Sequence, residues 1–206
     1  MWQTADVAIG PNDETGEKIL DAVIRVWQSF GVKRISIDMI AREAGVSHMS
    51  LYRRWPGKND LIMAAGIREV ERIMERCDER VAAVGSDEDA VVESFTTLYC
   101  LVRSHPLYIR EMTTEPEGIL PYVTILADPA IRMGVEYGVG LRDWKDPPEN
   151  LPEVVELGVR VVQSLLLTPP TQISLDTEDE VRAYARRVLV PLYRRITDQQ
   201  WSAVPG

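Results

Sequence analysis

The chain has 206 residues, of which 45% are hydrophobic and 27% are charged, a composition typical of a soluble protein with a buried core. At this length apolar burial alone can hold a fold together, so a stabilising disulfide or structural metal is not required. The longest apolar runs are far shorter than the roughly 20 residues that span a bilayer. We therefore expect no membrane partner.

The N-terminal residues lack the basic start and apolar stretch of a secretory signal peptide. The two cysteines, Cys77 and Cys100, fall in segments with helical periodicity and do not have the spacing of metal ligands. The two histidines, His48 and His105, are also far apart along the chain. These features predict a reduced, cytoplasmic protein with no metal site and no cofactor.

The net charge of −9 is unevenly distributed along the chain. Residues 15–60 hold 8 Lys and Arg against 5 Asp and Glu, whereas residues 61–206 hold 15 against 24. This asymmetry is typical of a basic module on an acidic body, although chance clustering of charge explains it as well. The charge therefore permits DNA binding without establishing it.

Nearly the whole chain shows the three- and four-residue apolar spacing of amphipathic helices. The first predicted helix starts from an N-cap at Thr15 and ends at Gly31. A second, short helix is expected to start from a cap at Ser36 and to end at Gly45. Ser47 is expected to cap a third helix.

A long helix is predicted over residues 61–84, with arginines and glutamates along its polar side. Each of these glutamates follows an arginine by three residues, so we interpret this side as a solvated face of ion pairs. The arginines are Arg68, Arg72, Arg76 and Arg80.

The remainder of the chain is also predicted to be helical. Its start and stop signals are, in chain order, Ser86, Pro106, Leu151, Pro169 and a capping box formed by Thr177 and Glu180. We expect Pro121 and Pro129 to break the stretch that holds them, and Pro191 to kink or end the last helix. No alternating run is long enough for a convincing strand, so the predicted fold class is all-α.

Residues 37–55 carry the pattern that indicates function. Two short helices meet around Ala41, which is small enough for closely crossing helices, and Gly45, which tolerates the positive φ of a turn. This arrangement predicts a helix-turn-helix whose second helix enters the DNA major groove by its N-terminal residues. Those residues are Ser47, His48, Met49 and Ser50. Hydroxyl and cationic groups for phosphate contacts follow at Tyr52, Arg53, Arg54 and Lys58.

This stretch resembles the TetR family of transcriptional regulators. The matching text runs from Ile35 to Leu61, after an amphipathic helix that ends in Phe30 and Gly31, and the resemblance covers about residues 15–65. It implies an N-terminal three-helix helix-turn-helix domain joined to a larger helical ligand-binding and dimerisation domain. The expected divisions are a mobile N-terminal arm at 1–14, the DNA-binding domain at 15–60 and the larger domain at 61–206.

The resemblance also implies roles for individual residues. Backbone contacts map onto Ser36, Tyr52 and Lys58, and base-reading contacts map onto Ser47, His48, Met49 and Arg53. The family often has a small residue at the position of Met49 and Phe at the position of Trp55. Met49 either reads thymine methyl groups or packs against the protein, and the polar neighbours of His48 favour a side chain that faces DNA.

A ligand pocket in the larger domain is the next implication. Its candidate lining residues are Phe95, Tyr99, Tyr108, Met112, Tyr122 and Tyr137, although stripes of Met and aromatic residues are more often plain core. Four glycines in helical stretches, Gly134, Gly138, Gly140 and Gly158, are interpreted as points of close helix packing rather than as room for a ligand. The apolar helix at 152–167 and the last helix at 177–197 are expected to build a four-helix dimer interface.

Together these features predict a homodimeric regulator, a repressor that binds a pseudo-palindromic operator in double-stranded DNA. A small apolar or aromatic effector is expected to release it by shifting the two DNA-binding heads. No catalysis is expected, because no catalytic motif is found in the sequence. Two alternatives remain open: a regulator of the same fold without a small-molecule effector, and a helical enzyme with an accidental likeness to a helix-turn-helix.

Overall fold

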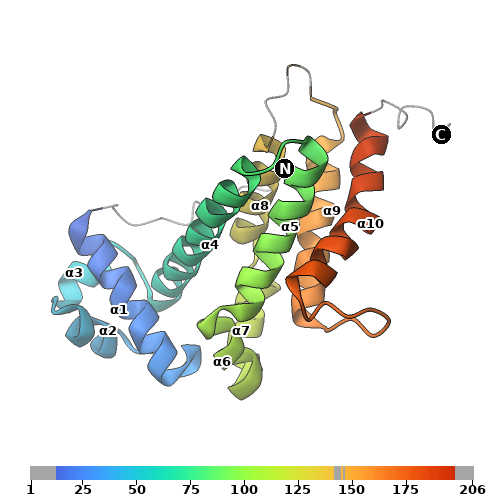
Figure 1. The fold of residues 1–206 in the computed structure, drawn as a ribbon. Helices are drawn as coiled ribbons and strands as arrows, with labels where there is room; N and C mark the ends of the chain where they lie inside the picture. Colours follow the sequence, from blue (N-terminus) through green and yellow to red (C-terminus); the bar gives the residue numbers. More distant parts are fainter. Residues whose placement is uncertain (1–12, 142–144, 146, 198–206) are drawn as a thin grey trace. The chain divides into compact units, whose positions relative to one another are not determined.

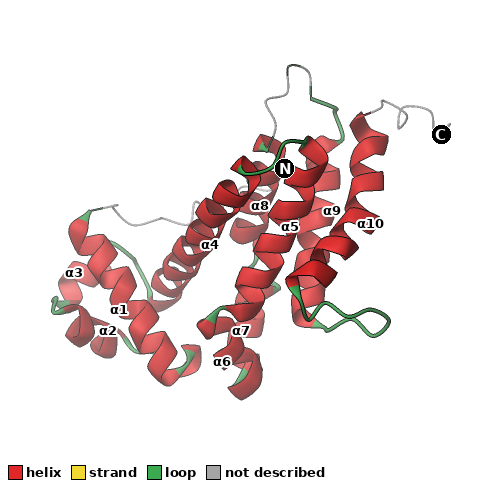
Figure 2. Cartoon of the chain, in the orientation of Figure 1, coloured by secondary structure: helices red, strands yellow, loops and turns green. Residues whose placement is uncertain are grey.

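The computed structural model describes residues 13–141, 145 and 147–197. This part of the chain is built from α-helices and one 3-10 helix, and it contains no strand (Figures 1 and 2). In chain order the elements are α1 (Glu14–Phe30), η1 (Val32–Arg34), α2 (Ile37–Ala44), α3 (His48–Tyr52), α4 (Lys58–Ala82), α5 (Asp87–Ser104), α6 (Pro106–Thr114), α7 (Pro116–Val123), α8 (Asp128–Gly140), α9 (Leu151–Leu167) and α10 (Glu178–Thr197). The all-α prediction is confirmed.

The helices belong to two compact units. The first unit holds α1, α2, α3 and the start of α4 up to Glu71, together with α6 and α7 in the segment His105–Pro129. The second unit holds the rest of α4 from Arg72, then α5, and the chain from Ala130 onward with most of α8, α9 and α10. The first unit thus includes two helices from beyond residue 60, because α6 and α7 pack with the N-terminal helices.

These packing units are not the functional divisions expected from the sequence. The assignment of DNA binding to 15–60 and of ligand binding and dimerisation to 61–206 stays a prediction. The expected arm at 1–14 lies almost wholly outside the described residues, except that Asp13 and Glu14 belong to the start of α1.

Helix α1 begins two residues earlier than predicted. Its N-cap is Asp13, whose carboxylate accepts a hydrogen bond from the backbone N–H of Gly16 at 2.6 Å, so the prediction of Thr15 as the cap is wrong. Asp is a somewhat better N-cap than Thr, and the acidic residues of the first turn favour the positive end of the helix dipole. At the other end, Gly31 leaves the helix with φ 80°, as expected for a glycine stop.

The helix-turn-helix forms from the local signals seen in the sequence. Ser36 accepts a hydrogen bond from the N–H of Met39 and caps α2, and Ser47 accepts one from the N–H of Ser50 and caps α3. Gly45 lies in the left-handed region with φ 67°, a conformation that side-chain-bearing residues rarely adopt. The predicted turn between α2 and α3 is confirmed.

One apolar core holds the first unit together. Residues from α1, α2, α3 and the start of α4 fill it, and those almost inaccessible to solvent include Ile19, Val23, Ile40, Leu51, Trp55 and Leu61. Because Leu51 is buried, the short helix α3 is anchored by one face and offers the rest of its surface to solvent.

A second core lies between α5, α9 and α10 (Figure 1). Its buried residues include Val92, Phe95, Val162, Val181 and Leu189. Helix α10 lies along α5, and three pairs of charged side chains connect the two helices: Arg182 with Glu93, Arg186 with Asp89, and Arg194 with Glu88.

Most of the helix signals after residue 85 are confirmed. Ser86 accepts a hydrogen bond from the N–H of Asp89, and Thr177 and Glu180 cap each other reciprocally. One proline expectation is wrong, because Pro121 lies inside α7. Helix α10 continues past Pro191 to Thr197, so this proline does not end the helix, and the kink expected there as the other outcome stays a prediction.

The interpretation of the α4 arginines as a solvated face is wrong at Arg68. Its side chain is only 8% exposed, and Nη1 donates hydrogen bonds to the backbone oxygen of Glu17 at 3.2 Å and to its carboxylate at 3.0 Å. Nη2 lies 2.8 Å from the carboxylate of Asp21. Arg68 therefore ties α4 to α1, because this part of the helix faces a neighbour rather than water.

Candidate nucleic-acid interface and ligand cavity

Helix α3 presents large side chains to solvent. Met49 is 77% exposed and Tyr52 is 50% exposed, while Leu51 between them is buried. Of the two interpretations left open for Met49, packing against this chain does not fit its exposure. Both side chains are accessible to a DNA groove.

Of the three serines expected at DNA, two are helix N-caps and the third is hydrogen-bonded to one of them. The hydroxyl of Ser36 accepts from the N–H of Met39 at 3.2 Å, and that of Ser47 accepts from the N–H of Ser50 at 3.2 Å. The hydroxyls of Ser47 and Ser50 also lie 3.1 Å apart and share a hydrogen bond. A hydroxyl that accepts at a cap still has its own hydrogen to donate to a phosphate.

His48 lies outside the core, as expected, and it has a partner. Its side chain is 53% exposed, and Nε2 lies 2.8 Å from Oδ1 of Asp38, which is 80% exposed on α2. Asp38 was not singled out from the sequence. The only signal was a carboxylate in the first turn of the preceding helix, ten residues before His48.

The cations near α3 have different environments. Arg53 is exposed, and Lys58 is partly buried as the first residue of α4. The side chain of Arg54 is only 7% exposed and lies 2.6 Å from the carboxylate of Asp13. The bond from Gly16 N–H, followed by the charge of Arg54, holds the pKa of Asp13 below its ordinary value. Arg54 thus links the end of α3 to the start of α1.

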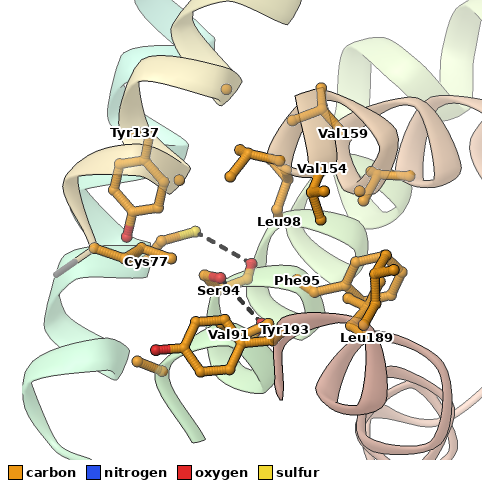
Figure 3. A pocket seen from close by; sticks show the side chains of 18 of the residues that line it. Cys77, Val91, Ser94, Phe95, Leu98, Tyr137, Val154, Val159, Leu189 and Tyr193 are labelled. Carbon is orange, nitrogen blue, oxygen red and sulfur yellow. Dashed lines mark hydrogen bonds between the residues drawn. The ribbon is translucent and has the colours of Figure 1, made fainter. Parts of the chain in front are cut away.

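A largely apolar cavity of about 130 Å³ lies inside the second unit, among α4, α5, α8, α9 and α10 (Figure 3). Its walls are mainly aliphatic and aromatic, with Val91, Phe95, Leu98, Tyr137, Val159 and Leu189 among the lining residues. Among the described residues that line it, the single charged side chain is that of Asp87, which is exposed to solvent.

Two polar side chains of the cavity, those of Cys77 and Tyr137, stay neutral. Burial raises the pKa of the Cys77 thiol to about 12, and this thiol donates to the backbone oxygen of Ser94 at 3.9 Å (Figure 3). Burial, ahead of the nearby Asp78 carboxylate, also raises the pKa of Tyr137. Neither group carries charge at neutral pH, so the cavity suits uncharged ligands.

Residues 19–65 match the family model of the bacterial regulatory proteins of the tetR family. Residues 37–55 in that segment form the helix-turn-helix described above. Residues 19–65 thus form a helix-turn-helix segment of the TetR type.

Named relatives are HTH-type transcriptional regulators. An uncharacterised HTH-type transcriptional regulator of Mycobacterium bovis is 28% identical over 50% of this chain and 52% of its own length. The chain thus spans about half the length of the curated relatives with the strongest matches shown. A regulator of the same description from Mycobacterium tuberculosis is 26% identical over 85% of this chain and 84% of its own.

A solved structure shows the same fold. The TetR-family repressor AlkX from Dietzia, implicated in the biodegradation of n-alkanes, superposes with a TM-score of 0.69. It is 18% identical in sequence and covers 87% of this chain and 97% of its own.

The residues expected in a TetR-type ligand pocket are divided between the two units. Phe95 and Tyr137 line the cavity. Tyr99 is buried in the core of the second unit but is not among the lining residues. Met112 and Tyr122 pack against the core of the first unit, so the structure does not bring them to this cavity.

Most of the cavity lining was not singled out from the sequence. It consists of aliphatic residues whose pattern indicates only burial, such as Leu98, Val154, Val155, Val159 and Leu189. For Val154, Val155 and Val159 the signal was the apolar circumference of the helix at 152–167.

The four helical glycines fall into two classes. A Cβ atom on Gly134 would lie 3.0 Å from Val159, and one on Gly138 would collide with Val155, so close packing is confirmed at these two positions. A Cβ atom on Gly140 or Gly158 would have no neighbour within 4 Å, so the packing interpretation is wrong there. Gly158 lines the cavity and leaves room in it.

Two other kinds of site are absent from the described ranges, 13–141, 145 and 147–197. No three His, Cys, Asp or Glu residues are grouped so that they could hold a metal ion. No helix there has both the length and the apolar character needed to cross a bilayer.

Proposed function

We propose that this TetR-family DNA-binding regulator is a dimeric cytoplasmic repressor that binds a pseudo-palindromic operator and releases it when a small uncharged molecule occupies the cavity. The observation that carries the DNA-binding part is α3, a short helix anchored by Leu51 that offers Met49 and Tyr52 to solvent behind a tight turn at Gly45. A helix held in this way is suited to insertion into a major groove.

Roles on DNA follow from residue type and exposure. We assign the phosphate backbone to Ser36, Ser50, Tyr52 and Lys58, and base reading to Ser47, His48, Met49 and Arg53. Met49 is exposed and apolar, which suits contact with thymine methyl groups, and Arg53 is an exposed guanidinium, which suits guanine.

The effector is assigned by the chemistry of the cavity. Its walls present aliphatic and aromatic carbon, and the one charge on the described lining is the carboxylate of Asp87. An anionic ligand would be repelled by that carboxylate and would find no cation on the lining to pair with. We therefore propose a neutral, mainly apolar or aromatic molecule. Phe95 and Tyr137 are its assigned contacts, and Tyr99, Met112 and Tyr122 are no longer assigned to it.

The dimer is assigned to α9 and α10. Leu157 on α9 and Val188 on α10 are large apolar side chains exposed in a single chain. Burying such residues against a second copy stabilises an interface, and two helices from each chain would form a four-helix bundle.

Two experiments test this function. Selection of bound DNA from a random pool should return a pseudo-palindrome, and a chain that binds all DNA alike would contradict the proposal. A thermal-shift screen should then find uncharged compounds that stabilise the protein and weaken operator binding.

A matched pair of variants assigns those compounds to the cavity. Gly158→Leu adds a side chain to the cavity lining, whereas Gly140→Leu adds the same side chain at an open position outside the lining. Only Gly158→Leu should abolish the shift. Compounds that bind without changing DNA affinity would favour the alternative regulator that lacks a small-molecule effector. No observation favours a helical enzyme.

A further inference from the structure

The first residue of the recognition helix is tied to the helix before it. Nε2 of His48 lies 2.8 Å from Oδ1 of Asp38, within hydrogen-bonding distance. Both side chains are exposed, so the pair lies on the surface of the helix-turn-helix rather than in its core. The pair therefore buries little surface. One of its two members, His48, is a residue that we assign to base reading.

This contact restricts the chemistry of the imidazole. An ionised carboxylate can only accept, so the short distance requires a hydrogen on Nε2. In the neutral ring the other nitrogen, Nδ1, then has a lone pair and acts as an acceptor. Without a partner the ring is free to rotate and to exchange tautomers, and it offers a base either a donor or an acceptor.

Bases differ in what they offer such an acceptor. In the major groove adenine presents N6–H₂ and cytosine presents N4–H₂ as donors, whereas guanine N7 and O6 and thymine O4 only accept. An imidazole held by Nε2 thus accepts from adenine or cytosine and is mismatched to an acceptor edge.

We propose that Asp38 is a positioning residue for base recognition, holding His48 by Nε2 so that Nδ1 selects an adenine or cytosine amine at one position of each half-site. The proposal rests on the DNA-binding function proposed above. Asp38 acts through His48 and needs no contact with DNA itself.

The test must separate this role from the charge of Asp38. A carboxylate near DNA weakens binding to every sequence, and an acid in the first turn also favours α2 through the helix dipole. Glu43 supplies the matched control, because it lies in the same helix, is exposed and pairs with Arg25 of α1 at 2.7 Å rather than with α3. Replacing it removes the same charge without touching His48.

The experiment uses the full chain at one pH and one salt concentration. Dissociation constants are measured on the selected operator and on every single-base variant of one half-site. The proteins compared are wild type, Asp38→Ala, Asp38→Asn, Glu43→Ala, His48→Ala and the double variant Asp38→Ala with His48→Ala. Melting curves show that each variant is folded, and Asp38→Ser replaces Asp38→Ala if the latter is not.

Asp38→Ala should reduce the preference at one base pair by about fivefold, the value of one ordinary hydrogen bond. Asp38→Asn keeps an acceptor oxygen and should keep the ranking of bases, although it loses the same charge. Glu43→Ala should change affinity for all sites by a similar factor. In the His48→Ala background, Asp38→Ala should change no ranking, because the residue it positions is gone.

Three results overturn the proposal. In the first, Asp38→Ala changes the affinity for all sites by the same factor, as Glu43→Ala does. In the second, Asp38→Ala and Asp38→Asn give the same ranking of bases, and in the third, Asp38→Ala still changes this ranking when His48 is absent. A wild-type chain that selects no sequence from the random pool defeats the proposed function as well. That outcome is distinct from a sequence-specific protein whose ranking ignores Asp38.

Discussion

At the scale of single residues, the carboxylate of Glu111 shows how one buried group joins distant parts of the chain. It is 1% exposed on α6 and accepts hydrogen bonds from Nε1 of Trp27 at 2.9 Å and from the backbone N–H of Val32 at 3.0 Å. The two donors lie in and just after α1, about 80 residues earlier in the chain. A buried carboxylate is costly to desolvate, and these bonds offset that cost.

Glu111→Ala should lower the free energy of unfolding by about 3 kcal/mol, because it leaves two buried donors without an acceptor. Glu111→Gln keeps one acceptor oxygen and should cost less. The measurement is urea unfolding followed by tryptophan fluorescence. Glu117→Ala is the control, since Glu117 pairs with Lys33 at the surface and should have little effect. An Ala variant at position 111 as stable as this control would contradict the role of Glu111.

Lys58→Ala and His48→Ala should affect DNA binding in different ways. Loss of a phosphate contact weakens binding to all sequences alike and lowers the slope of log affinity against log salt by about 1. Loss of a base contact instead changes the ranking of operator variants. Affinities on the selected operator and two point variants, at several salt concentrations, make the comparison. A change of ranking with Lys58→Ala alone would reverse the two assignments.

At the scale of helices, the packing of α8 on α9 depends on two small residues. Val159 and Val155 of α9 approach Gly134 and Gly138 of α8 so closely that no larger residue fits without movement. Gly158 on α9 faces open space in the cavity instead. The same residue type therefore serves packing at one site and leaves volume at the other.

Gly138→Ala should destabilise the second unit, because the new methyl group overlaps Val155. Gly158→Ala should stabilise it by up to about 1 kcal/mol, since Ala is the better helix former and meets no neighbour. Thermal melting by circular dichroism measures both changes. Equal shifts of the same sign in the two variants would show that packing does not distinguish the sites.

The contact of α10 with α5 should be sensitive to acid. The hydrogen bond from Arg194 lowers the pKa of Glu88, and hydrogen bonds from Ser86 and Arg186 lower that of Asp89. A carboxyl group whose pKa is lower in the folded than in the unfolded state stabilises the fold at pH values above its unfolded-state pKa. This stability is lost as the pH falls through the folded-state pKa.

The melting temperature should therefore hold down to about pH 4.5, the ordinary value for Glu, and decline below it. The double variant Glu88→Gln, Asp89→Asn should have a lower melting temperature than wild type at neutral pH. The difference should shrink in acid, because the variant lacks the two carboxylates whose protonation destabilises the wild type. Melting curves between pH 7 and pH 3 test this. A constant difference between the two proteins across that range would contradict the linkage.

At the scale of the whole molecule, the proposed sequence specificity requires two copies of α3. Helix α3 is one and a half turns long, so one chain reads only a few base pairs. A second copy doubles the length of sequence read, and a dimer with twofold symmetry matches a palindromic site. The acidic composition of residues 61–206 also confines attraction for DNA to the basic N-terminal region.

The chain should sediment as a dimer at micromolar concentration, and the half-sites of its operator should lie about 34–36 Å apart or slightly more along one face of the DNA. Leu157→Glu at the proposed interface should shift the protein to monomer and abolish specific binding while leaving a folded chain. Sedimentation velocity and footprinting measure the two properties. A monomer that still recognises a single asymmetric site would exclude the dimer model.

The sequence by itself determined the features that depend on local bonds. Ser36, Ser47 and Gly45 specify the helix-turn-helix because a cap or a left-handed turn involves residues only three or four positions apart. For the same reason the all-α class and the resemblance to the TetR family were both evident from sequence patterns. Thr15 was displaced as the cap of α1, because Asp13 competes for the same cap.

The tertiary structure decided what depends on contacts between distant segments. Helical spacing marks Tyr137 and Met112 alike as apolar, but only packing places the first in the cavity and the second in the other unit. Arg68 and Glu111 look like surface charges in the sequence, and they are buried because their partners lie about 50 and 80 residues away. Asp38 meets His48 only across the turn between two helices. Such meetings depend on how whole helices pack, which no local pattern of residues specifies.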